Sequence, residues 1–80
     1  MKIGEAVRYR IFDLCEQRDL SINRLSLLSG LTQSTLNNIV SGRNKGTSVI
    51  TLKKICDGLE ITIQDFFDSP LFENLDDELK

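Results

Sequence analysis

The chain has 80 residues, of which 40% are hydrophobic, and a formal net charge of −2. A chain of this length has room for one domain with a small core. No hydrophobic run exceeds two residues and the first residues include charges, so the sequence predicts neither a membrane span nor an export signal. We therefore expect a cytoplasmic protein with no membrane partner.

The composition also limits the chemistry. The chain contains no His, and its two cysteines, Cys15 and Cys56, lie far apart within apolar helical patterns. Free Cys is among the most often buried residue types, so core packing is the favoured interpretation of both. No spacing suggests a metal site, and no nucleophile stands beside a base. We expect no catalytic residue, no metal and no cofactor, and hence no enzyme.

Charge is unevenly distributed along the chain. Residues 1–59 carry nine basic and five acidic groups, a net charge of +4, whereas residues 60–80 carry one basic and seven acidic groups, a net charge of −6. A basic body is compatible with a nucleic-acid partner, because phosphate contacts supply much of the affinity in such complexes. The acidic residues of the tail are interpreted as a solvated end of the chain.

The first predicted helix runs from Glu5 to about Arg18, because apolar residues recur there at spacings of three and four. Three of its polar side chains are predicted to point outward, namely Arg8, Glu16 and Gln17.

A second, shorter helix is predicted to begin after Ser21, a good N-cap residue. Its apolar face is formed by Ile22, Leu25 and either Leu27 or Leu28.

The third predicted helix runs from Gln33 to Ser41, capped by Thr32. Gly30 before it and Gly42 after it can take the left-handed conformation that ends a helix. The apolar residues Leu36, Ile39 and Val40 share one face, and the polar side chains that project from the other face are Ser34, Asn37, Asn38 and Ser41.

Two further helices follow a polar loop at residues 43–47. Ser48 caps the fourth, whose inward residues are Ile50 or Val49, then Leu52, Ile55, Cys56 and Leu59. Thr62 caps the fifth, with Asp65 at the position of a capping-box partner.

The end of the chain predicts a sixth short helix, because Ser69-Pro70 is a cap followed by a proline at the first helical position. Its apolar residues are Leu71, Phe72, Leu75 and Leu79. Two interpretations of the aromatic and leucine cluster at residues 66–72 stay open, with core closure favoured over a dimer contact.

Taken together, the predicted elements give an all-α fold class, with five helices in one domain at residues 5–67 and an acidic amphipathic tail at residues 68–80.

Residues 21–41 have the layout of a helix-turn-helix unit, in which the second helix lies in the DNA major groove. The segments that carry this pattern are Leu20-Ser21, Leu25-Ser26, Ser29-Gly30-Leu31-Thr32, Gln33-Ser34-Thr35-Leu36, Ile39, Ser41-Gly42-Arg43 and Thr51-Leu52-Lys53-Lys54-Ile55. They resemble the phage-repressor and Cro-like helix-turn-helix family, also called the xenobiotic response element family, over about residues 7–67. The resemblance implies a five-helix fold, sequence-specific binding to a double-stranded DNA operator as a repressor or regulator, and a homodimer.

The resemblance places the base-reading positions on Gln33, Ser34 and Asn38, with Thr32 and Thr35 near base or backbone and Asn37 flanking. The helical pattern alone points to nearly the same set, since most of these side chains project outward. Asn and Gln amides pair bidentately with adenine, so we expect A·T pairs in the half-site. The competing interpretation is an ordinary solvated helix face.

The third helix carries no charge, so phosphate contacts must come from its flanks. The expected contacts are Arg43, Asn44 and Lys45 in the following loop, together with the helix starts capped by Ser21 and Thr32. Lys53 and Lys54 are as readily explained by solvation. Two positions differ from the family pattern: Ile22 stands where Gln is frequent, and Ser26 stands where Ala is frequent.

The competing function is a protein-interaction module, such as an antitoxin or adaptor, that uses the same fold and binds its partner through the acidic tail. Fold alone does not decide between these functions. No small-molecule ligand is expected, because the chain has no room for a separate ligand-binding domain.

Overall fold

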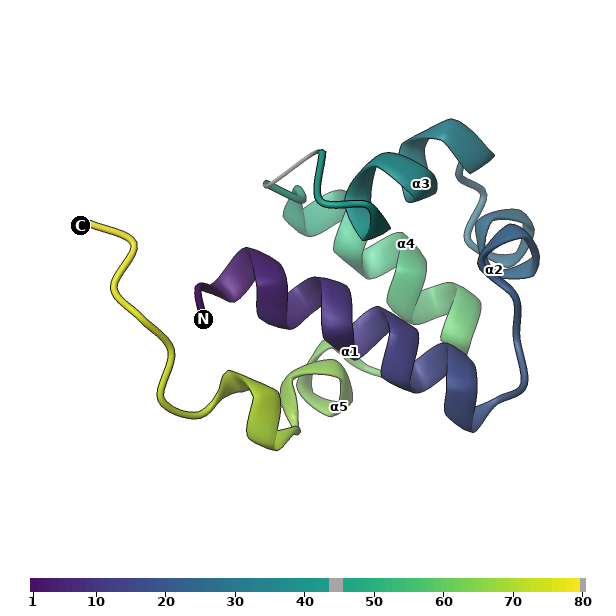
Figure 1. Ribbon diagram of the computed structural model, residues 1–80. Coiled ribbons are helices and arrows are strands. Elements are labelled where there is room, and N and C mark those ends of the chain that lie inside the picture. The colour runs from purple at the N-terminus through teal and green to yellow at the C-terminus, as the bar shows by residue number, and fades with distance from the viewer. Residues whose placement is uncertain (44–45, 80) are drawn as a thin grey trace.

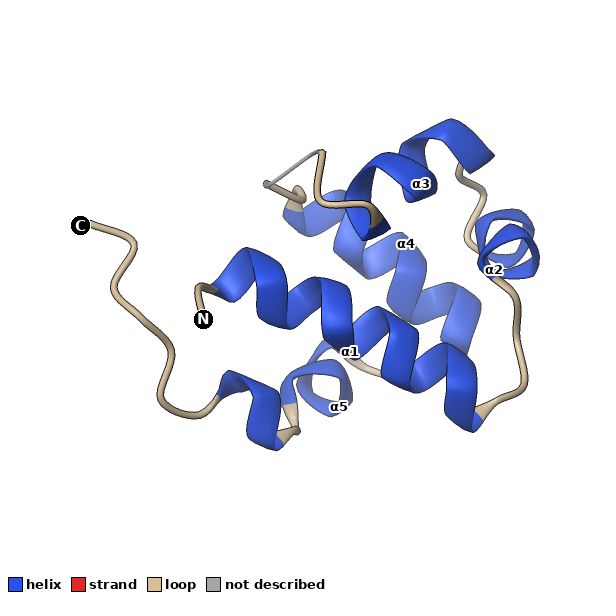
Figure 2. Ribbon diagram, viewed as in Figure 1, coloured by secondary structure: helices blue, strands red, loops and turns tan. Residues whose placement is uncertain are grey.

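The computed structural model describes residues 1–43 and 46–79, and these form an all-helical domain without strands (Figures 1 and 2). The five α-helices and one short 3-10 helix are α1 (Ile3–Gln17), α2 (Ile22–Leu28), α3 (Gln33–Val40), α4 (Val49–Leu59), α5 (Ile63–Phe67) and η1 (Pro70–Phe72). The predicted all-α class with five helices is therefore confirmed. No helix within the described ranges combines the length and the apolar run that a membrane span requires.

Four helices begin with the predicted hydroxyl caps. Ser21, Thr32, Ser48 and Thr62 each accept a hydrogen bond from the backbone N–H three residues later. Asp65 completes a capping box with Thr62, as predicted. Such a cap contributes about 1 kcal/mol to helix stability, and these helices are too short to be stable by propensity alone.

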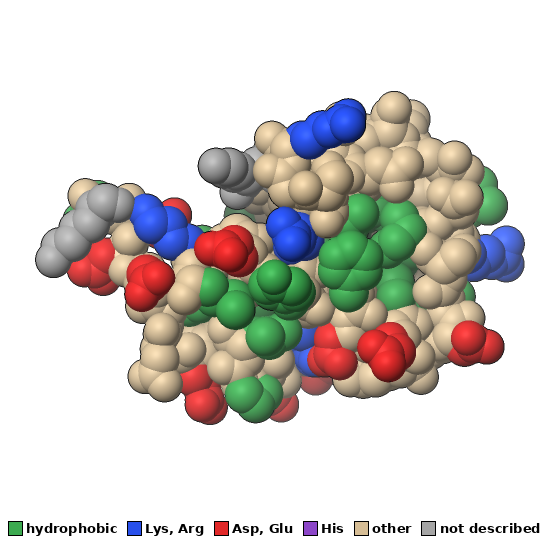
Figure 3. Space-filling view, in the orientation of Figure 1, with side chains coloured by type: hydrophobic (Ala, Val, Ile, Leu, Met, Phe, Trp, Pro, Cys, Tyr) green, Lys and Arg blue, Asp and Glu red, His purple; other side chains and the backbone are tan. Residues whose placement is uncertain are grey.

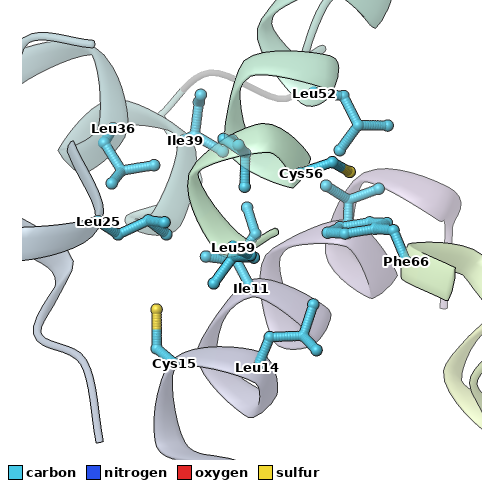
Figure 4. Close-up of a cluster of buried hydrophobic side chains, with 12 residues drawn as sticks. Ile11, Leu14, Cys15, Leu25, Leu36, Ile39, Leu52, Cys56, Leu59 and Phe66 are labelled. Carbon is cyan, nitrogen blue, oxygen red and sulfur yellow. The ribbon is translucent and has the colours of Figure 1, made fainter. Parts of the chain in front are cut away.

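Buried side chains from α1 to α5 meet in one core (Figure 4). The largest that are fully buried are Phe66, Ile11, Leu25, Leu36 and Ile55. Each of these five comes from a different helix, so the core depends on all of them together.

Two predicted apolar faces were wrong in part. Leu27 and Leu28 are 68% and 45% exposed, and Val49 and Ile50 are 76% and 73% exposed. The buried residues of α2 are Leu25 and Ser26, and the small C-cap residue Ser29 is also buried where α2 lies close to α4. In α4 the first turn extends past the core, so its apolar residues find no cover until Leu52.

The close approach of α2 and α4 depends on Gly58. A Cβ atom at this position would lie 3.1 Å from the carbonyl carbon of Leu28 and from the backbone nitrogen of Ser29, and would also clash with the Ser29 hydroxyl. Both separations are too short for a real side chain without backbone movement. The position of α2 on the domain is therefore set by backbone contact with α4.

The chain after α5 differs from the predicted sixth helix. Only Pro70–Phe72 is helical, as a single 3-10 turn, and Asn74 has a positive φ of 59°. A helix long enough to align Leu75 with Leu79 is thus absent from the described tail, and Leu79 is 99% exposed. The rings of Phe66, Phe67 and Phe72 pack at centroid distances of 4.7–6.0 Å, which supports core closure as the role of this cluster.

The tail then runs beside the N-terminus of α1, on the side of the molecule where both chain ends lie (Figure 1). The backbone N–H of Asp76 donates to the carbonyl of Met1 at 3.0 Å, and the Asp76 carboxylate pairs with the Met1 ammonium at 3.2 Å. The backbone N–H of Ile3 donates to the Glu78 carboxylate at 3.3 Å. Carboxylates are favoured at a helix N-terminus, where N–H groups lack partners within the helix.

The buried side chain of Arg10 joins α1 to the end of α5. Its Nε donates to the carbonyl of Phe66 at 2.7 Å and one Nη to the carbonyl of Asp65 at 2.9 Å, with a longer contact to Asp68. The other Nη pairs with the Asp13 carboxylate at 3.1 Å. The Asp65 carbonyl also accepts from the backbone N–H of Asp68 at 3.2 Å, and Arg10 provides a donor to the Phe66 carbonyl in the last turn of α5, where acceptors lack donors within the helix.

Replacing Arg10 with Met should lower the free energy of unfolding by about 3 kcal/mol, because Met keeps much of the apolar stem but removes the donor to the buried Phe66 carbonyl and the ion pair with Asp13. Urea denaturation followed by circular dichroism measures the change. The control, Arg24→Met on the exposed surface of α2, should change stability by less than about 0.5 kcal/mol. Equal urea midpoints for Arg10→Met and the unaltered protein would contradict this role.

Both cysteines lie in the core, as predicted, at 4% and 0% exposure for Cys15 and Cys56. Burial raises the pKa of both thiols above the ordinary 9.0, and nearby Arg18 and Lys53 offset part of that effect. A thiol with a raised folded-state pKa stays protonated after the unfolded chain has begun to ionise.

Folding stability should accordingly be insensitive to these thiols below their ordinary pKa and should fall as the pH rises above it. The test compares urea midpoints between about pH 7 and pH 10 for the unaltered protein and a Cys15→Ala, Cys56→Ala variant. The fall should be smaller in the variant, which has no thiols to ionise. An identical fall in both proteins would refute the prediction.

Candidate nucleic-acid interface

The second and third helices form a helix-turn-helix unit held by backbone and side-chain bonds. Gly30 takes a positive φ of 66° in the turn, and the N–H of Leu31 donates to the carbonyl of Ser26 at 3.0 Å. Ser26 is buried, and its hydroxyl donates to the carbonyl of Asn23 at 2.7 Å. Ser26 is therefore tolerated at a position where the family often has Ala, because its hydroxyl is satisfied within α2.

Helix α3 presents a neutral polar face to solvent. Leu36 and Ile39 hold the helix on the core, where α3 contacts α1 and α2. The exposed side chains of the opposite face are those of Gln33, Ser34, Asn37 and Asn38. In Figure 3 the surface over α3 is mostly tan with a basic group beside it, and acidic side chains gather over other parts of the molecule. The arrangement offers amide and hydroxyl groups suited to hydrogen bonding with base edges.

Thr32 and Thr35 lie at the start of this face and bond to one another. The Thr32 hydroxyl accepts from the backbone N–H of Thr35 at 3.1 Å and donates to the Thr35 hydroxyl at 2.8 Å. Thr32 thus has both roles of its hydroxyl engaged, whereas the Thr35 hydroxyl keeps its own hydrogen for an outside acceptor.

Possible phosphate contacts flank α3. Ser21 caps α2 by accepting from the backbone N–H of Arg24 at 3.0 Å, so its own hydroxyl hydrogen is available to donate. Arg43 is exposed directly after Gly42, which ends α3 with a φ of 83°. The predicted contacts Asn44 and Lys45 lie outside the described residues.

Other predicted contributors fall into two groups. Lys53 pairs with Asp57 one turn away on α4, so part of its charge is balanced locally, whereas Lys54 is exposed. Ile22 is half-buried against the core, so it anchors the start of α2 by packing where a family Gln would use its amide. No group of three metal-binding side chains lies together in residues 1–43 and 46–79.

One basic residue near this surface was not anticipated. Arg8 was predicted to point outward, but it is half-buried and its guanidinium lies against Gly42 at the end of α3. On a helical wheel Arg8 falls at the edge of the apolar face, next to Cys15, and this position could have indicated that its side chain is partly buried.

These features define the class of the protein as a DNA-binding domain. They are a small helical fold, a helix-turn-helix unit with capped helices, and a second helix that exposes uncharged amide side chains. The chain belongs to the family of Cro/C1-type helix-turn-helix DNA-binding domains, whose model matches residues 10–70.

The chain is also similar to a solved structure, the crystal structure of the prophage Lp1 protein 11. The two share 44% sequence identity with a TM-score of 0.77, over 88% of this chain and 93% of that chain. A comparison with curated proteins gave no match.

Proposed function

We propose that this protein is a sequence-specific transcriptional regulator, acting as a repressor, that inserts α3 into the major groove of an operator. The observation that carries the proposal is the face of four exposed, uncharged side chains on the second helix of the helix-turn-helix unit. Base reading is assigned to Gln33, Ser34 and Asn38, with Thr35 and Asn37 beside them. Thr32 contributes as the cap that fixes the first turn.

Phosphate binding is assigned to the residues around this face. Ser21 and Arg43 are exposed on either side of α3, and Asn44 and Lys45 of the following loop complete the proposed set. Because α3 itself carries no charge, these flanking groups provide the affinity that is common to all DNA sequences, while α3 provides the selectivity. The proposed division of the chain is a DNA-binding domain at residues 5–67 followed by an acidic tail.

The alternative, an antitoxin or adaptor, would bind its partner through the acidic, amphipathic tail. The described tail forms one 3-10 turn and then packs beside the N-terminus of α1, so no helical docking face supports that function within residues 68–79. DNA binding is therefore the function that the geometry supports best.

Selection from random double-stranded DNA tests the proposal. The purified protein should enrich one motif containing A·T pairs, and Gln33→Ala should lose discrimination at one base pair by about 1–3 kcal/mol. The control is Gln64→Ala on the exposed surface of α5, which should enrich the unaltered motif. Recovery of no motif by folded protein would refute operator binding, and an unchanged motif for Gln33→Ala would remove that residue from base reading.

We further propose that the protein binds as a homodimer on a pseudo-palindromic operator, since a single domain of this size reads only a few base pairs. Analytical ultracentrifugation with the selected DNA should show two protomers per site, and the two half-sites should be centred about 34 Å apart. Detection of monomer alone, both free and on DNA, would be incompatible with this arrangement.

A further inference from the structure

Arg8 lies where the first helix meets the end of the reading helix. A Cβ atom on Gly42 would stand 2.8 Å from a terminal nitrogen of Arg8, so the glycine leaves the space that the guanidinium occupies. Arg8 also lies over the Tyr9 ring, with its central carbon 5.1 Å from the ring centroid. Helix α1 thus holds a positive charge beside the backbone that links α3 to Arg43.

The guanidinium of Arg8 is incompletely satisfied. Its Nε is buried, and no acceptor lies within hydrogen-bond distance among the residues that the structure describes. Arg8 also takes no part in the ion pairs found within residues 1–43 and 46–79. Burial of a charged donor without an acceptor is unfavourable. Because the buried Nε is closed to solvent, an anion from outside the domain would contact Arg8 through its terminal Nη atoms.

A cavity of about 600 Å³ opens beside this group. Its charged lining comes from Lys2, Glu5 and Arg8 of the N-terminal region and from Glu78 of the tail, and Gly42 forms part of its wall. Glu78 is held there by the backbone N–H of Ile3. Figure 3 shows basic and acidic side chains next to one another on this side of the molecule.

Glu78 determines the net charge of this lining. With Glu78 in place, two basic and two acidic side chains balance; without it, the lining has a net charge of +1.

We propose that Arg8 binds a phosphate of the operator backbone and that Glu78 of the tail competes with that phosphate for the cavity. The inference rests on the proposed function, because it requires α3 to lie on DNA. A guanidinium binds phosphate through two parallel hydrogen bonds, and Arg43 extends the same basic edge. The tail therefore weakens DNA binding in proportion to its occupancy of the cavity.

The test measures affinity for the selected operator as a function of salt concentration. Arg8→Gln should weaken binding to operator and unrelated DNA alike and should reduce the slope of log affinity against log salt by about 0.9 per protomer. Arg8→Lys should keep the slope, since it keeps the charge. If Arg8 only stabilises the end of α3, Arg8→Gln will lower the melting temperature and leave the slope unchanged, which would overturn the proposal.

Variants of Glu78 provide a second test of the proposal, which does not depend on the stability of Arg8 variants. Glu78→Gln should tighten binding to the operator about two- to fivefold at low salt. The control Asp77→Asn, which changes the exposed residue next to Glu78, should have a smaller effect. In the Arg8→Gln background, Glu78→Gln should lose its effect, because the two changes act on one site. Equal effects of Glu78→Gln and Asp77→Asn would overturn the competition.

The failures of the two proposals are distinguishable. A selected motif with an Arg8→Gln slope equal to that of the unaltered protein overturns the Arg8 contact and leaves operator binding intact. Failure to bind any DNA overturns both.

Discussion

The interaction on which the fold most depends is the contact of the Arg10 guanidinium with the carbonyls at the end of α5. Without it, the last α-helix would place unsatisfied acceptors against the core, and Phe66 would lose the backbone that positions its ring. Phe66 in turn closes the cluster to which α1, α3 and α4 each contribute. The position of α3 on the core is thus linked to a hydrogen bond between Arg10 and Phe66, two residues that are 56 positions apart in the sequence.

Features that depend on neighbouring residues were predicted well. The four hydroxyl caps and the positive φ of Gly30 and Gly42 follow from chemistry within one turn of the chain, and each was confirmed. The exposure of Gln33, Ser34, Asn37 and Asn38 was also predictable, because α3 has a clean apolar face that fixes its rotation. Their use in base reading is a matter of chemistry outside the chain, and it stays a prediction.

Features that depend on distant contacts were not predictable from the pattern. Periodicity identifies which side of a helix is apolar, but it does not tell how far the neighbouring helices extend to cover it, as Val49 and Ile50 show. Arg8 is half-buried only because Gly42, a residue of another helix end, comes close to it. The tail does not continue as a helix past Phe72: Asn74 has a positive φ, and the backbone N–H of Asp76 donates to Met1 and not to a residue of the tail.

The glycine of α4 against which α2 rests has a consequence for how the helix-turn-helix unit is held on the domain. Gly58 lets the backbone of α4 approach the Leu28–Ser29 backbone and the small Ser29 side chain, so a larger residue at position 58 would push the two helices apart. Substitutions on the exposed outer face of α3 leave this contact untouched, because α3 does not take part in it. The contact between α2 and α4 therefore holds the helix-turn-helix unit on the domain independently of which side chains α3 exposes.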